Sequence, residues 1–153
     1  MRTSSALASG PSTRSENALA LGQGAIFLAC GVWPLVHLPS FQAVTGPKAD
    51  EWLVRTVGSL LGVTGGVLIS AGLRRRITPE IRALAVGSAG VLTAIDCIYA
   101  AKGRISRVYL LDAALELGFI AGWAMAARRR RRVRKARERV RPSPEAEAIH
   151  APA

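Results

Sequence analysis

Four long apolar runs constrain the fold of this chain more than any other feature of its sequence. They cover about residues 18–36, 52–73, 81–100 and 108–127. A helix needs ~20 predominantly apolar residues to cross the hydrocarbon core of a bilayer, and each run has about that length. A helix at the surface of a soluble core would carry a polar stripe at 3.6-residue spacing, which none of the runs has. The sequence therefore predicts four transmembrane helices.

The net charge of the chain alone would suggest a nucleic-acid-binding protein, but the positions of the charges argue against one. Its 153 residues include 21 Lys and Arg against 10 Asp and Glu, a net charge of +11. Ten of the basic residues are concentrated between Arg128 and Arg141, and no aromatic residue lies among them to stack on bases. Nucleic acid is thus the least favoured partner. The apolar content of 50% also excludes a disordered chain.

The distribution of basic residues predicts the orientation in the membrane. Four spans place both termini and the second loop on one side, together with sixteen of the 21 basic residues. The first and third loops, on the other side, contain only Lys48, Lys102, Arg104 and Arg107. Because cytoplasmic loops carry an excess of Lys and Arg, we predict that both termini are cytoplasmic.

The predicted fold class is an all-α, four-helix transmembrane bundle in which the short loops make successive helices antiparallel neighbours. Residues 1–17 are expected to form a disordered polar N-terminus and residues 18–127 the membrane domain. Residues 128–153 are expected to form an Arg-rich cytoplasmic tail that ends in a flexible Pro/Ala/Glu segment. Thr78, Pro79 and Glu80 are typical of a helix N-cap and first turn, and Gly103 is typical of a helix end.

The second apolar run has a small residue at every fourth position, a pattern that predicts close helix packing. In lipid there is no hydrophobic driving force between helices, so the close approach of small-faced backbones matters more. We expect this face to pack within the chain, and a homodimer is the alternative. The four residues are Gly58, Gly62, Gly66 and Ser70.

Ionisable residues inside the apolar runs form the candidate site. At ~1.5 Å of rise per residue, Arg55, Asp96 and Asp112 each lie roughly 5–6 Å from the outer end of their span. Glu116 lies one turn deeper than Asp112 on the same helix face. His37, at the outer end of the first span, is a further candidate member. Because isolated charges are costly in lipid, we expect the planar guanidinium of Arg55 to bridge Asp96 and Asp112.

Two interpretations of this cluster stay open: an ionic latch that sets helix register, and an outward-facing proton or ligand site. The first makes the chain a non-enzymatic, multi-pass membrane protein of unknown activity whose outer Arg/Asp/Glu cluster joins the helices. The first alternative is a small proton-coupled carrier or lipid-binding protein that uses Asp112 and Glu116. The second is a membrane enzyme that acts on a lipid-like substrate by carboxylate proton transfer. No catalytic residue is assigned.

The sequence predicts no metal and no cofactor. Cys30 and Cys97 fall at different depths, the two histidines do not cluster, and no nucleotide-binding fingerprint occurs. The predicted partners are therefore the bilayer itself and, at the start of the tail, anionic lipid headgroups. The tail residues expected to contact these headgroups are Arg128, Arg129, Arg130, Arg131, Arg132, Arg134 and Lys135.

Three stretches carry a resemblance to a known family: GVWPLVH at residues 31–37, SFQAVTGPKADEWLVRTVG at 40–58 and ISRVYLLD at 105–112. With these stretches the chain resembles a family of small, uncharacterised bacterial membrane proteins with four helices. The resemblance covers about residues 19–126, implies a bacterial inner-membrane location and lends no catalytic residue. It draws attention to residues 45–48 in the first loop. They are expected to form a capped start of the second long helix, with Pro47 in its first turn, and a lid-like turn over the charges is the alternative.

Overall fold

The computed structural model describes residues 13–140, and the side chains of residues 13–136. Within this part of the chain the secondary structure is entirely helical. The helices are α1 (Arg14–Val36), α2 (Leu38–Thr45), α3 (Glu51–Leu73), α4 (Pro79–Ala101) and α5 (Tyr109–Val140). All except α2 include a segment that is long and apolar enough to cross a membrane. The predicted all-helical class with four membrane-length helices is confirmed.

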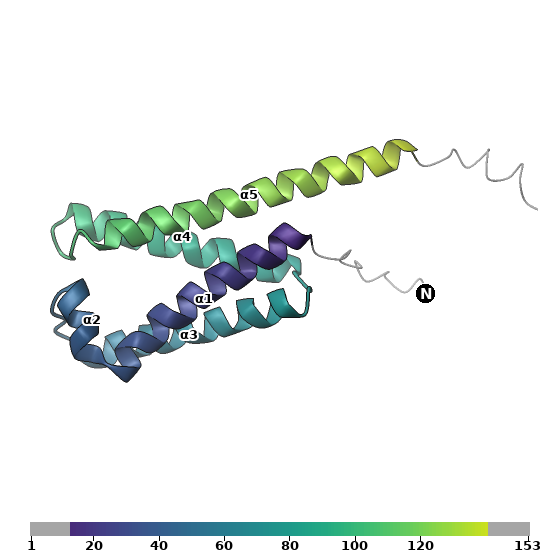
Figure 1. The fold of residues 1–153 in the computed structure, drawn as a ribbon. Helices are drawn as coiled ribbons and strands as arrows, with labels where there is room; N and C mark the ends of the chain where they lie inside the picture. The colour runs from purple at the N-terminus through teal and green to yellow at the C-terminus, as the bar shows by residue number, and fades with distance from the viewer. Residues whose placement is uncertain (1–12, 141–153) are drawn as a thin grey trace, which may run out of the picture.

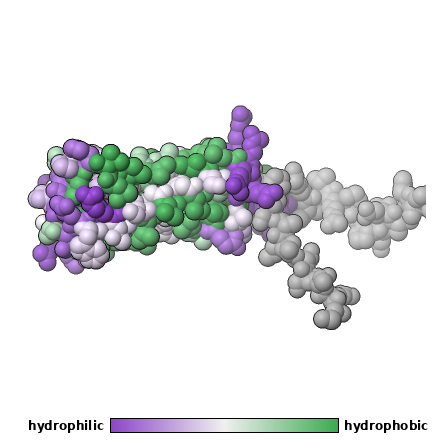
Figure 2. Space-filling view, turned by 90° about the horizontal axis from the view of Figure 1, so that it is seen from below, coloured by the Kyte–Doolittle hydropathy of each residue, from purple (hydrophilic) through white to green (hydrophobic). Residues whose placement is uncertain are grey.

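The four long helices run along a common direction (Figure 1). α1 runs from one end of the bundle to the end where α2 lies, and α3 runs back. α4 then runs toward the α2 end, and α5 runs back again. The closest packing is within the pairs α1–α3 and α4–α5, while contacts between the two pairs are fewer. Figure 2 shows an apolar surface belt between two hydrophilic ends, as a lipid-facing bundle requires.

The described helices extend beyond the predicted spans at both ends of the chain. The side chain of the N-cap Thr13 accepts a hydrogen bond from the Glu16 backbone N–H, and the Glu16 carboxylate accepts one from the Thr13 N–H at 2.9 Å. This capping box makes residues 14–17 helical, although they were expected to belong to the disordered N-terminus. The predicted N-cap at Thr78 is confirmed. α5 continues to Val140, and the predicted flexible segment after it lies outside the described residues.

The first loop contains a short helix, α2, that the apolar pattern did not predict. The His37 side chain accepts a hydrogen bond from the Ser40 N–H at 3.2 Å and so caps this helix. Trp33 fixes α2 against the end of α1, because its indole N–H donates to the Ser40 hydroxyl at 2.8 Å and its ring packs edge-on against Phe41. Pro47 lies outside both helices, so the expected capped helix start at this proline is wrong.

Glycines bring the backbones of α1 and α3 into direct contact. A Cβ atom on Gly65 would lie 2.6 Å from the Gly24 carbonyl oxygen, and one on Gly58 would lie 2.7 Å from the Gly31 carbonyl oxygen. A Cβ on Gly31 would collide with the backbone of Gly58 and Gly62. No side chain fits at these positions, which is the close approach expected between helices in lipid.

Only part of the predicted small-residue stripe belongs to this contact. Gly58 and Gly62 face α1, whereas a Cβ on Gly66 would meet nothing within 4 Å and Ser70 is exposed. The reason is helix geometry, because each four-residue step advances by about 40° beyond a full turn and the stripe drifts away from Gly58. A seven-residue step returns to within about 20°, so Gly65 takes the place expected for Gly66.

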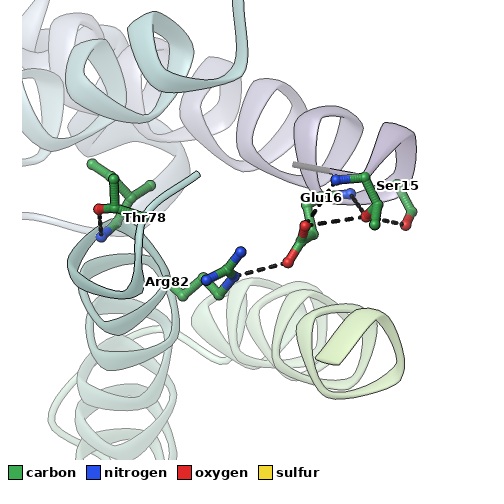
Figure 3. Close-up of polar contacts among 6 residues, drawn as sticks. Ser15, Glu16, Thr78 and Arg82 are labelled. Carbon is green, nitrogen blue, oxygen red and sulfur yellow. Dashed lines mark hydrogen bonds and ion pairs between the residues drawn. The ribbon is translucent and has the colours of Figure 1, made fainter. Parts of the chain in front are cut away.

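At the end of the bundle opposite α2, buried polar side chains connect the two helix pairs. The Nε of Arg82, in the first turn of α4, donates to the Glu16 carboxylate at 2.8 Å (Figure 3). Gln23 lies about two turns beyond Glu16 on α1. Its side chain donates to the Ala85 carbonyl at 2.8 Å and accepts from the Trp123 indole N–H at 2.9 Å. These bonds join α1 to α4 and α5 and close this end of the bundle.

Adjacent glycines provide a matched test of the α1–α3 contact. We expect Gly65→Ala to lower the free energy of unfolding by about 1–3 kcal/mol, because its Cβ would overlap the α1 backbone. Gly66→Ala is the control and should leave stability unchanged or slightly raised, since its Cβ meets open space. Unfolding by a denaturing detergent, followed by circular dichroism, measures both. Equal effects of the two variants would contradict the packing.

Candidate functional site

A cavity of about 420 Å³ lies at the α2 end of the bundle, between the two helix pairs. Its walls come from all five helices. Phe27, Trp33, Val57 and Leu61 belong to the α1–α3 side, and α2 contributes Phe41 and neighbouring residues. The cavity exists because contacts between the pairs are sparse, while the Glu16–Arg82 and Gln23 bonds tie the pairs together at the other end.

Three of the predicted acidic residues line this cavity together. Asp96 comes from α4, and Asp112 and Glu116 come from successive turns of α5. Asp96 and Asp112 lie close enough to interact directly, and Glu116 lies within electrostatic range of both. Because a carboxylate can only accept hydrogen bonds, Asp96 and Asp112 can bond to each other only when one of them carries a proton.

Two carboxyl oxygens of this group are buried without a hydrogen-bond partner. Asp96 is 4% exposed and Glu116 is 1% exposed. Asp96 Oδ2 and Glu116 Oε2 have no hydrogen-bond partner in the described part of the chain. A buried polar atom that makes no hydrogen bond costs about 1–3 kcal/mol. Two such atoms beside one cavity indicate a site that a bound group would complete.

Arg55 and His37 do not belong to the cluster. Arg55 is exposed on α3 and forms no ion pair with Asp96 or Asp112, so the expected guanidinium bridge is absent from the described structure. Its position in the second turn of α3 places its side chain on the outer surface, where a long cationic side chain can extend to the membrane–water interface. His37 is also exposed and caps α2 instead of facing the acids.

The cation at the cavity is Lys48, a residue of the first loop that was not among the predicted site residues. Its ammonium donates to the Thr45 carbonyl at 3.0 Å and lies 5.0 Å from the centre of the Tyr109 ring. Thr45, Lys48 and Tyr109 all line the cavity, so α2 and the segment after it form part of its wall. In the sequence, only the resemblance that drew attention to residues 45–48 pointed to a role for Lys48.

Cys30 is a second residue whose place the sequence did not predict. It lines the cavity from α1, within electrostatic range of Asp112 and Glu116. Cys30 is free and exposed, so its thiol can be modified by a reagent that enters the cavity. Cys97 is free and exposed on α4.

The remaining predicted residues lie away from the cavity. Within residues 13–136 no group of His, Cys, Asp or Glu side chains is placed to hold a metal ion. The basic residues predicted to contact anionic lipids continue α5 beyond the apolar segment, and all except the half-buried Arg130 are exposed. They lie at the end of the bundle where α1 begins (Figure 1).

The charge of the cavity can be tested through Cys30. In a Cys97→Ser background, we expect a cationic methanethiosulfonate reagent to modify Cys30 about tenfold faster than an anionic one of similar size. A cleft lined by one sign of charge concentrates ions of the opposite sign. Mass spectrometry after timed quenching gives the rates. Ala49→Cys in a cysteine-free background, on the exposed loop, should show a ratio near one. A faster anionic reaction at Cys30 would contradict an acidic cavity.

Searches of protein families, curated proteins and solved structures find no match to this chain. The candidate site therefore rests on its own geometry: three carboxyl groups from one helix pair, an apolar wall from the other, and further lining residues from the short helix α2.

Proposed function

We propose that this chain is a small multi-pass membrane protein that binds a small molecule in the cavity between its helix pairs. The observation that carries the proposal is the pair of buried, unpartnered oxygens on Asp96 and Glu116 beside a cavity of about 420 Å³. This volume is within the range of small-molecule sites, which are mostly apolar with a few convergent polar groups. An ionic latch that only set helix register would be expected to pair its acids with a cation. Arg55, the cation predicted for that latch, is exposed on α3 and does not pair with them.

Proton exchange is part of the proposed function. We propose that Asp96 and Asp112, which line the cavity together, share a proton that a bound polar group can replace. Intramembrane carboxyl groups that face a cavity are typical of proton relays and transport sites. The proposal therefore favours the proton-coupled binder or carrier over a purely structural role for the acids.

The proposal includes an orientation and an origin. We propose antiparallel neighbouring helices with both termini in the cytoplasm. The excess of basic residues in the two termini and the second loop supports this orientation. The cavity then opens near the outer surface, and the basic turns of α5 lie against the anionic inner leaflet. Because residues 40–58 carry the motif of that resemblance, we propose that the chain belongs to the small bacterial four-helix membrane proteins that it resembles.

Mass spectrometry of the purified protein tests the binding function. We expect wild-type protein in lipid nanodiscs to retain a small molecule that Glu116→Gln loses by at least about tenfold, because the variant removes an acidic oxygen from the cavity. Glu80→Gln is the matched control, since it removes an exposed acid at the opposite end of α4. The same small-molecule content in wild-type and Glu116→Gln protein would contradict the proposal.

A further inference from the structure

We infer that the ligand of this cavity is an amphiphilic organic cation, a protonated amine attached to an apolar body. This inference rests on the proposed binding function and adds the chemical class of the ligand. It is carried by the charges, the distribution of apolar side chains and the position of Lys48.

The charges of the cavity favour a cation. Asp96, Asp112 and Glu116 line it, and Lys48 is the one cationic side chain among its described lining residues. Lys48 forms no ion pair with these acids in the described structure, because its ammonium is held at the Thr45 carbonyl and the Tyr109 ring. The two unpartnered oxygens on Asp96 and Glu116 can only accept hydrogen bonds when ionised, so they suit a donor such as an ammonium.

The two sides of the cavity are chemically different. All three acids come from the α4–α5 pair, whereas Phe27, Val57 and Leu61 on the α1–α3 pair are apolar. A ligand that fits both sides has a cationic group directed toward α4 and α5 and an apolar body against α1 and α3. A uniformly polar cation would leave the apolar wall unused, and a neutral lipid chain would leave the acids unpartnered.

Lys48 shows how a cation is held at the opening. Its ammonium lies 5.0 Å from the centre of the Tyr109 ring and is bonded to a backbone carbonyl 3.0 Å away. Aromatic rings attract cations at such distances, and Trp33 and Phe41 provide two more rings at the cavity. The part of the cavity wall around Lys48 therefore already provides the aromatic ring and the carbonyl oxygen that an ammonium group would contact.

Binding of an ammonium between Asp96 and Asp112 replaces the proton that we propose these two cavity-lining groups share. One proton then leaves to solvent for each cation bound, and the charge of the site is conserved. The titratable and charged groups that line this site are Cys30, Lys48, Asp96, Tyr109, Asp112 and Glu116. A measurable proton release is thus a second property that separates this inference from simple apolar binding.

Three probes with the same phenylbutyl body test the inference: 4-phenylbutylamine, 4-phenylbutan-1-ol and 4-phenylbutyrate. Titration calorimetry uses the full chain in phosphatidylcholine nanodiscs, with protein-free nanodiscs to subtract partition into lipid. We expect the amine to bind at least about tenfold more tightly than the alcohol, and the carboxylate most weakly, because hydrogen bonds to charged groups are the stronger ones. Repeating the amine titration in two buffers of different ionisation enthalpy should give about one proton released.

The outcomes separate the inference from the proposed function. Equal affinity for the three probes, tightest binding of the carboxylate, or no proton release would overturn the cation assignment and leave the binding function standing. No binding of any probe above protein-free nanodiscs would overturn both. Glu116→Gln should weaken amine binding by at least about tenfold, with Glu80→Gln as the control, and an unchanged affinity would place the amine elsewhere. The wild-type series decides the question even if Glu116→Gln does not fold.

Discussion

The backbone contact between α1 and α3 is the constraint on which the rest of the structure depends. Glycines at Gly24, Gly31, Gly58 and Gly65 let these two helices touch along their length. The close contact makes α1 and α3 one unit, and α4 and α5 form a second unit with fewer contacts to the first. In lipid, where apolar burial does not drive helices together, side-chain packing and interhelical hydrogen bonds hold the two units together, and Phe27, Ala85 and Trp123 belong to one buried cluster that draws on both units.

The two ends of the bundle differ in what lies beside their buried polar groups. At one end, both amide atoms of Gln23 form hydrogen bonds and Glu16 is paired with Arg82, although the Nη2 atom of Arg82 is buried without a partner. At the other end, Asp96 and Glu116 each keep a buried oxygen without a partner beside the cavity. Because a cavity of about 420 Å³ adjoins only the second end's unpartnered groups, it favours a binding role over a structural one for these acids.

The apolar runs were sufficient to predict the four long helices, because period and length depend on the local sequence alone. They also predicted that Asp96, Asp112 and Glu116 lie together, since their depths and the i, i+4 spacing follow from helix geometry. The partner of these acids could not be predicted, because depth does not specify the direction in which Arg55 points. α2 and Lys48 were missed for a related reason: the cap at His37 and the Trp33–Ser40 bond have no periodic signature.

The central claim is that no cation within residues 13–136 forms an ion pair with the acids of the cavity. The free energy of unfolding of Arg55→Gln in detergent micelles tests it most directly, because Arg55 is the cation that depth and cost would assign to Asp96 and Asp112. The structure predicts a change within about 0.5 kcal/mol, as is usual for an exposed side chain outside any ion pair. A loss of about 3–5 kcal/mol, typical of breaking a buried ion pair, would contradict the account.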